Sequence, residues 1–160
     1  MVHIFTTGGT IDKIYFDAKN TYHIGEPAIA RVLREAGVTV PFEVEPVLRK
    51  DSLELTDEDR AILAERVAAS PAHCILVTHG TDTMARTAEV LRAVAGKTII
   101  LTGSMQPALF RDSDAVFNIG AAFLAAQTLP PGVHLVMQGR AFPAGRVRKN
   151  LEKNAFEEIT

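Results

Sequence analysis

The stretch "CILVTHGTDTM", residues 74–84, contains the strand-to-helix transition on which the fold depends. Its first half, Cys74–Thr78, is short, apolar and rich in β-branched residues, which is typical of a strand buried on both faces. Gly80 allows the backbone to turn sharply off the strand, and a helical pattern runs from Thr83 to Ala95 before Gly96. A strand, a turn and a helix in this order predict an α/β unit.

Similar units repeat along the rest of the chain. Four further strand-like runs are Val2–Thr6, Phe42–Leu48, Thr98–Thr102 and His134–Gln138, and three further helical segments are Pro27–Gly37, Asp57–Ala69 and Ser113–Gln127. Alternating strands and helices imply right-handed crossovers and a mostly parallel, five-stranded sheet with helices on both faces. Residues 7–25, which suggest a hairpin, and residues 139–160 are irregular and long for connections, and such loops are commonly functional.

The composition favours a single globular domain spanning residues 1–160. The sequence is 47% hydrophobic and 22% charged, and it contains no candidate interdomain linker. A net charge of −2 gives no argument for a nucleic-acid or anionic-membrane partner, and no apolar stretch approaches the ~18 residues of a membrane span. The single cysteine, Cys74, excludes an intrachain disulfide and a cysteine zinc site, and it favours a reducing, cytoplasmic location.

Polar residues follow each predicted strand at its carboxyl end, where ligands bind in an open parallel sheet. The segments are Thr7–Thr10, Lys50–Ser52, His79–Thr83, Gly103–Gln106, and Gly139–Arg140 with a basic tail around Arg146 and Lys149. We therefore expect hydroxyl groups, an acid and a lysine to collect on one rim of the sheet. No cluster of His, Cys and acidic residues has metal-ligand spacing.

Each of these residues also has a plain structural explanation. Thr81 or Asp82 can cap the helix that starts near Thr83, the glycine pair at 8–9 can form a tight turn, and Lys149 can belong to a solvated basic face. The glycines match neither a phosphate-binding loop nor the G-x-G-x-x-G fingerprint. A threonine hydroxyl becomes a nucleophile when a base takes its proton, and a lysine beside an acid can be that base.

Four motifs together resemble one known family. They are "TTGGTI" after the first strand, "VTHGTDTM" after the third, "TGSMQP" after the fourth and "GRVRKN" near the end. The chain is similar to the N-terminal domain of the two-domain, bacterial-type L-asparaginases from its first residue to about residue 156. The resemblance implies a flavodoxin-like, three-layer α/β/α fold with sheet order 2-1-3-4-5 and a hairpin lid near the N-terminus. It also implies hydrolysis of asparagine to aspartate and ammonia without a metal or organic cofactor.

The resemblance assigns catalytic roles residue by residue. Thr10 matches the family's nucleophile at the base of the lid, and Tyr22 matches the tyrosine that accompanies it. Thr81, Asp82 and Lys149 match a threonine–aspartate–lysine triad that activates a nucleophile or a water molecule. The resemblance leaves open whether the reaction passes through an acyl-enzyme or proceeds by direct attack of water.

The resemblance also assigns substrate contacts. Ser52 matches the serine that holds the α-carboxylate of the substrate, and Asp82 would also hold its α-amino group. Ser104 matches a position whose backbone carbonyl faces the substrate amide. The remaining candidate substrate-binding residues are Gly9, Asp51 and Gly80.

Other polar and apolar positions have more than one explanation. His79 is expected to be structural, with a hydrogen bond near the strand end. Asp112, Asp114 and Asn118 could cap the following helix, contact a partner or support the site, and a cap is the default expectation. The apolar residues Val116, Phe117 and Phe123 could face the core or a partner, since a 3.6-residue pattern fits both.

The sequence departs from the family pattern in three ways. Residues 1–160 contain no counterpart of the second domain that normally follows, Asp12 replaces a small residue, and Leu53 stands where a glutamine often occurs. We therefore expect a short-chain asparaginase that closes its site within a small homo-oligomer and uses asparagine, with glutamine as a second candidate substrate. The alternatives are an ammonia-releasing component of an amidotransferase and a non-catalytic asparagine-binding module.

Overall fold

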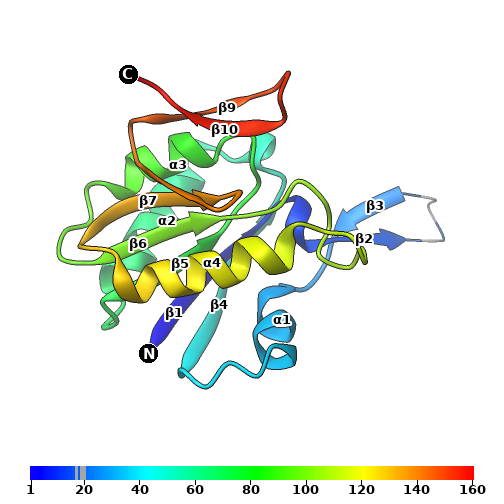
Figure 1. Cartoon of the computed structure of the whole chain (residues 1–160), viewed down its shortest axis with the longest axis horizontal. Coiled ribbons are helices and arrows are strands. Elements are labelled where there is room, and N and C mark those ends of the chain that lie inside the picture. The colour runs from blue at the N-terminus through cyan, green and yellow to red at the C-terminus, as the bar shows by residue number, and fades with distance from the viewer. Residues whose placement is uncertain (17, 19–20) are drawn as a thin grey trace.

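The computed structural model describes residues 1–16, 18 and 21–160 and contains a central six-stranded sheet (Figure 1). Its strands, in spatial order, are β4 (Phe42–Lys50), β1 (Val2–Gly8), β5 (Cys74–Thr78), β6 (Thr98–Thr102), β7 (Gly132–Met137) and β8 (Arg140–Pro143). The first five are parallel, in the order 2-1-3-4-5 along the sequence, and β8 pairs antiparallel with β7. This confirms the predicted α/β fold and strand order, and it adds a sixth strand.

The C-terminal segment, residues 139–160, was expected to be irregular, but it forms strands. After β8, the strands β9 (Val147–Asn150) and β10 (Ala155–Glu158) form a separate antiparallel hairpin that packs against α3 (Figure 1). These strands have only four residues and carry several charged side chains, so the sequence lacks the apolar run that identifies a strand. Val147 and Phe156 are the buried residues that attach the hairpin to the core.

In the described part of the chain, four helices cover the sheet: α1 (Ile29–Glu35), α2 (Asp57–Ala69), α3 (Met84–Leu91) and α4 (Ala115–Thr128). Helices α2 and α3 pack on one face and α1 and α4 on the other, which gives the expected three layers. Alternate strand residues supply the two cores, because Ile75 and Val77 face α2 and α3 while Leu76 faces α1 and α4. A capping box between Thr56 and Asp59 fixes the start of α2.

A β-hairpin leaves the sheet directly after β1, as predicted. Its strands, β2 (Lys13–Phe16) and β3 (Thr21–Ile24), project away from the domain (Figure 1). A short 3₁₀ turn, Thr10–Asp12, connects β1 to the hairpin. The base of the hairpin is closed because Gly25 N donates to Asp12 O at 2.7 Å, and it is attached to the domain because Ala108 N donates to Ile11 O at 3.0 Å. In the part of the chain that the structure describes, none of the helices has the length and apolarity needed to cross a membrane.

Candidate active site

Three of the proposed catalytic residues are in hydrogen-bonding contact. Lys149 Nζ lies 2.8 Å from Thr81 Oγ1 and 2.7 Å from Asp82 Oδ1. The Lys149 side chain is only 14% exposed, so it does not belong to a solvated basic face. Thr81 and Asp82 do not cap α3, whose N-cap residue is Thr83. The geometry therefore forms a lysine-centred polar triad at the edge of the sheet.

The lysine reaches this position through the C-terminal hairpin. Residues two apart on a strand point to the same side. On β9, Val147, which is buried, and Lys149, which is partly buried, form such a pair. Val147 packs into the core beside α3, and Lys149 lies opposite Phe156 of β10 in the ladder. The two apolar anchors of the hairpin thus direct the Lys149 amine toward the turn after β5.

Close backbone contacts bring the turns after β1, β4 and β5 together. Gly9 has φ 85° and ψ −178°, and a Cβ atom there would overlap the backbone N and Cα of Gly80. A Cβ atom on Gly80 would lie only 2.7 Å from Ser52 Cβ. Because Thr10 and Thr81 each directly follow one of the two touching glycines, the chain places them on the same edge of the sheet.

Tyr22 occupies a different environment from the triad. It lies on β3, is 48% exposed, and packs edge-on against Tyr15 and Phe110 with ring centroids 5.5 and 6.0 Å apart. Within the described residues, Tyr22 makes no hydrogen bond to Lys149 or Thr81. The structure therefore joins this tyrosine to the loop after β6.

Ser52 has an unused hydrogen-bonding group in a buried position. The residue is 1% exposed, and its Oγ atom has no hydrogen-bond partner among the described residues. A buried polar atom without a partner is uncommon in folded proteins and calls for an explanation. The neighbouring Asp51 forms an ion pair with Lys13 at 3.0 Å. Burial raises the pKa of Asp51, but the Lys13 hydrogen bond and charge and the Leu53 amide outweigh it, and the net pKa is lowered.

The loop that carries Ser104 is held by the start of α4. Asp114 accepts hydrogen bonds from Met105 N at 2.9 Å and Gln106 N at 3.1 Å. Asn118 donates through Nδ2 to Gly103 O at 3.0 Å. Asp114 is the N-cap residue of α4, as the default expectation has it by position, but its carboxylate makes no capping bond and binds the loop after β6 instead.

Comparison with known proteins agrees with this arrangement. The family model "Asparaginase, N-terminal" matches residues 1–159. The chain belongs to the asparaginase N-terminal domain family. A solved structure of the thermostable L-asparaginase from Thermococcus kodakarensis superposes with a TM-score of 0.85 at 28% identity, covering 99% of this chain and 51% of that chain.

Three curated relatives show the range of the family. The L-asparaginase of Thermococcus kodakarensis is 32% identical over 138 residues, which cover 82% of this chain and 42% of that protein. The glutaminase-asparaginase of Acinetobacter glutaminasificans is 30% identical, covering 97% and 52% respectively. A glutamyl-tRNA(Gln) amidotransferase component from Pyrobaculum aerophilum is 33% identical, covering 81% and 32%. The asparaginase-family chain thus spans about half the length, or less, of these relatives.

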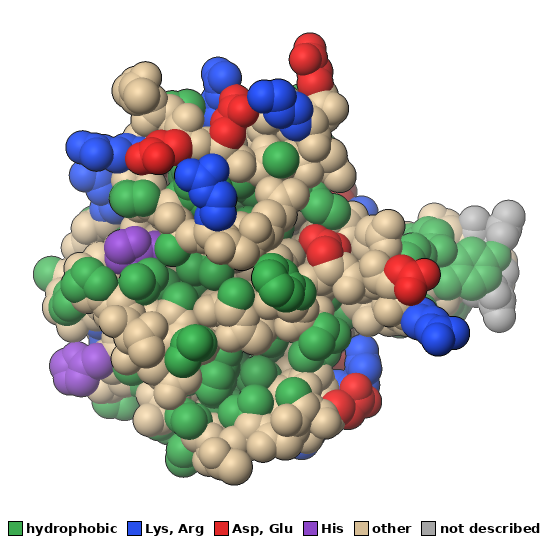
Figure 2. All heavy atoms as spheres, viewed as in Figure 1, with side chains coloured by type: hydrophobic (Ala, Val, Ile, Leu, Met, Phe, Trp, Pro, Cys, Tyr) green, Lys and Arg blue, Asp and Glu red, His purple; other side chains and the backbone are tan. Residues whose placement is uncertain are grey.

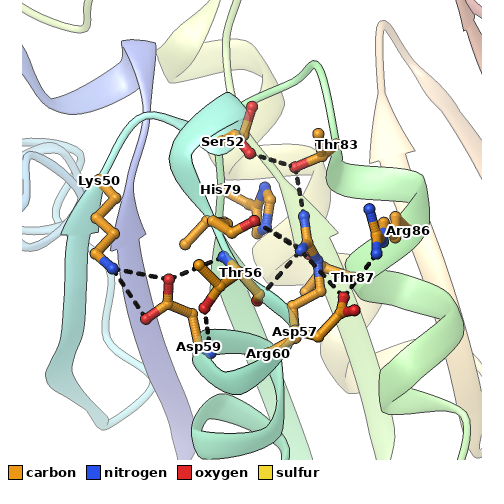
Figure 3. A network of polar contacts seen from close by, with 11 residues as sticks. Lys50, Ser52, Thr56, Asp57, Asp59, Arg60, His79, Thr83, Arg86 and Thr87 are labelled. Carbon is orange, nitrogen blue, oxygen red and sulfur yellow. Dashed lines mark hydrogen bonds and ion pairs between the residues drawn. The ribbon is translucent and has the colours of Figure 1, made fainter.

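The structure also reveals a buried arginine that was not predicted from the sequence. Arg60 of α2 is 2% exposed and lies beneath Ser52 and Thr83 (Figure 3). It occupies the inward-facing position that precedes the buried residues Leu63 and Val67 by three and seven residues. A charged residue at an apolar position of a helical pattern is the signal that could have identified it.

His79 is structural in this asparaginase-family fold. Its Nδ1 atom lies 2.7 Å from Gly80 O, and its Nε2 atom lies 2.7 Å from Thr87 Oγ1. Burial lowers the pKa of His79 to about 4, and the charge of Arg60 acts in the same direction. The imidazole is therefore neutral at pH 7, with its proton on Nδ1, where the carbonyl accepts it.

Asp12 is a buried acid at the base of the hairpin. It is 4% exposed, and its Oδ1 atom accepts a hydrogen bond from Ala28 N at 2.9 Å. Burial raises the pKa of Asp12 to about 7, outweighing the Ala28 hydrogen bond and the charge of Arg49, which lower it. Asp12 therefore links the 3₁₀ turn that begins at Thr10 to the start of α1.

Across residues 1–16, 18 and 21–160, no three His, Cys, Asp or Glu side chains are grouped so that they could hold a metal ion.

Proposed function

We propose that this chain hydrolyses the side-chain amide of L-asparagine to L-aspartate and ammonia. The observation that carries the proposal is the contact of Lys149 Nζ with both Thr81 Oγ1 and Asp82 Oδ1. A neutral Lys149 amine can accept the Thr81 proton, and the Asp82 carboxylate stabilises the ammonium that forms. Family membership and the L-asparaginase relatives support the same activity.

Two reaction routes use these residues. In the first, Thr10 Oγ attacks the amide carbon and its proton is transferred to the amide nitrogen, so that the C–N bond breaks and ammonia leaves. Water then hydrolyses the threonyl ester, which releases aspartate and returns a proton to Thr10 Oγ. In the second, a water molecule activated by the Thr81–Lys149–Asp82 triad attacks the amide carbon directly and ammonia leaves. Tyr22 would accompany Thr10 on the hairpin lid.

The proposed substrate site uses groups on the same edge of the sheet. The unpartnered Ser52 hydroxyl would bind the α-carboxylate, and Asp82 would bind the α-amino group. The Ser104 carbonyl would face the amide nitrogen. Gly9 and Gly80 would allow the substrate to approach the backbone closely. No metal ion or organic cofactor takes part in this proposal.

Ammonia release by the purified chain tests the function. Wild type should release ammonia from asparagine, with glutamine measured in parallel because one relative is a glutaminase-asparaginase. Thr10→Val should abolish turnover without unfolding the protein, and persistent turnover would refute the role of Thr10. Lys149→Met should reduce kcat by about 100-fold or more. Lys153→Met is the matched control, since Lys153 is a solvent-exposed lysine in the same hairpin.

Two other functions would give different results in the same assay. The amidotransferase relative favours an ammonia-releasing component that works with a partner, which would show little turnover alone. A non-catalytic asparagine-binding module would bind the amino acid without turnover. Rapid ammonia release by the chain alone would exclude the binding module and weaken the partner-dependent function.

We also propose that the chain works as a homo-oligomer. Val116, Phe117 and Leu124 of α4 are exposed, whereas Phe123 of the same helix is buried. Figure 2 shows apolar side chains gathered on the face that α4 occupies in Figure 1. A second copy covering this face would remove it from water. The cytoplasmic location inferred from the single cysteine stays a prediction.

A further inference from the structure

Arg60 makes four hydrogen bonds with its buried guanidinium (Figure 3). Its Nη1 atom donates to the carbonyl oxygens of Leu55 at 2.9 Å and Thr56 at 3.2 Å. Its Nε and Nη2 atoms donate to Thr87 Oγ1 at 3.0 Å and Thr83 Oγ1 at 2.9 Å. The rigid fork of an arginine can bond to separate groups in this way, whereas a lysine amine cannot span them.

Among the described residues, the buried charge forms an ion pair only with an exposed acid at long distance. The nearby Asp57 carboxylate lies 3.8 Å from Nη1, and its side chain is 72% exposed. Asp59, another acid on the first turn of α2, is instead paired with Lys50 at 2.8 Å. Burying a charge with mainly neutral partners costs stability, and an apolar residue would fill the same volume at lower cost. We therefore look for the role of Arg60 in the positions at which its guanidinium holds its hydrogen-bond partners, not in a gain of stability.

One set of bonds connects Arg60 to the Ser52 segment. Thr83 Oγ1 accepts from Arg60 and donates its own proton to Ser52 O at 2.7 Å. Ser52 follows β4 and Thr83 follows β5, so this connection joins two separate segments of the site edge. Thr83 is the N-cap residue of α3, yet its hydroxyl makes no capping bond and is used for this link.

A second set of bonds connects Arg60 to the turn after β5. Thr87 Oγ1 accepts from Arg60 and donates to Nε2 of the neutral His79 ring. The other ring nitrogen, Nδ1, donates to Gly80 O. Gly80 directly precedes Thr81 and Asp82, so the guanidinium indirectly restrains the backbone that carries two members of the triad.

We propose that Arg60 is a positioning residue that fixes the Ser52 segment and the Gly80–Asp82 turn relative to each other. The inference rests on the proposed function for the identity of the substrate, and on the hydrogen bonds alone for the coupling between the two segments. Among the described residues, the hydrogen bonds of Arg60 go to Leu55, Thr56, Thr83 and Thr87 and not to the triad, so it acts on the site through Thr83 and Thr87.

The two connections predict separable kinetic effects. Thr83→Val removes the link to Ser52, which would hold the substrate carboxylate, so KM for asparagine should rise about tenfold with kcat changed less than about twofold. Thr87→Val removes the link to His79 and the Gly80 turn, so kcat should fall about tenfold with little change in KM. Arg60→Met should show both changes.

Steady-state kinetics and binding of L-aspartate by calorimetry test the proposal on these variants. Arg60→Lys should restore only part of the loss, because one ammonium group cannot bond to Thr83 and Thr87 together. Arg86→Met is the matched control: Arg86 ion-pairs with Asp57 in the same region at 2.7 Å but is exposed. Its kinetic constants should equal those of wild type.

Several outcomes would overturn the proposal. If Arg60→Met folds and its kcat and KM equal those of wild type, Arg60 has a structural role alone. The same conclusion follows if Arg86→Met changes kcat and KM as much as Arg60→Met does. If Arg60→Met does not fold, the two threonine variants carry the test, and the absence of the KM–kcat split in them refutes the coupling. If wild type releases no ammonia, the proposed function fails, and a tenfold weaker Kd for L-aspartate in Thr83→Val would still support the positioning role. If wild type does not bind L-aspartate either, both proposals are wrong.

Discussion

Replacing Gly9 by alanine tests whether backbone contact between two turns holds the site together. Gly9 adopts φ 85° and ψ −178°, a region essentially restricted to glycine, where another residue costs about 1–3 kcal/mol. The new Cβ atom would also overlap Gly80 N and Cα, and such overpacking costs about 1–3 kcal/mol. We expect Gly9→Ala to lower the free energy of unfolding by about 2–6 kcal/mol, a large share of the total of a domain.

Gly37→Ala provides the matched control. Gly37 also has a positive φ, +69°, but a Cβ atom there would have no neighbour within 4 Å. This variant therefore carries the backbone cost of about 1–2 kcal/mol without the overlap. Urea unfolding followed by circular dichroism measures the free energies of unfolding, and ammonia release measures activity. Turnover should be lost in Gly9→Ala, because relieving the overlap moves Thr10 away from Thr81, and retained in Gly37→Ala.

The reasoning is refuted if the two glycine variants are equally stable. Equal stability would mean that the turn after β1 can move away from Gly80 without cost, so the contact does not fix the site. Full activity in a Gly9→Ala protein that is clearly destabilised would show instead that the position of Thr10 relative to Thr81 is unimportant for turnover.

Three further perturbations act on other parts of the site. The pKa of Asp12 is raised, so between about pH 4 and about pH 7 the native state holds a proton that the unfolded chain has lost, and the free energy of unfolding should fall as pH rises through this range. Asp12→Asn should remove this pH dependence from urea titrations made at several pH values. Asp114→Ala should cost about 1–3 kcal/mol and speed amide exchange at Met105 and Gln106, while the exposed Asp112→Ala should change neither. Phe156→Ala should lower the free energy of unfolding by about 3–5 kcal/mol and should reduce turnover because it displaces Lys149. Ile159→Ala, at an exposed position, should change neither the free energy of unfolding nor the turnover.

Hydrophobic patterning was sufficient to predict the five parallel strands of the central sheet and its helices. The bounds of β5, β6 and α2 agree with the sequence prediction, because continuous apolar runs and a capping box mark their ends. Helix α3 is shorter than predicted and stops at Leu91, where the chain continues in turns. The short strands of the C-terminal segment were missed because tertiary packing of Val147 and Phe156, not local pattern, stabilises them.

The site was predictable only in part. The rule that ligands bind at the carboxyl ends of parallel strands places Thr10, Ser52 and Thr81 on one edge, and the glycine contacts agree with it. The same rule placed the basic tail around Lys149 on this rim, but it could not predict the contact of Lys149 with Thr81 and Asp82, because that contact depends on pairing within a hairpin outside the main sheet. Arg60 was overlooked among the many charges of α2, whose overall pattern is weakly amphipathic, although it aligns with buried Leu63.

The two ways in which residues reach the site have different consequences. Thr10 and Thr81 are positioned by turns whose backbones touch at the end of the central sheet, so a change at Gly9 must affect stability and activity together. Lys149 is positioned by a two-stranded hairpin, and such hairpins are marginally stable alone and depend on their packing against the domain. Loosening that packing can displace the Lys149 amine while the sheet remains folded. When the C-terminal hairpin is weakened, activity should therefore be lost before global stability. This order of loss distinguishes Lys149, which the hairpin positions, from Thr81, which the central sheet positions.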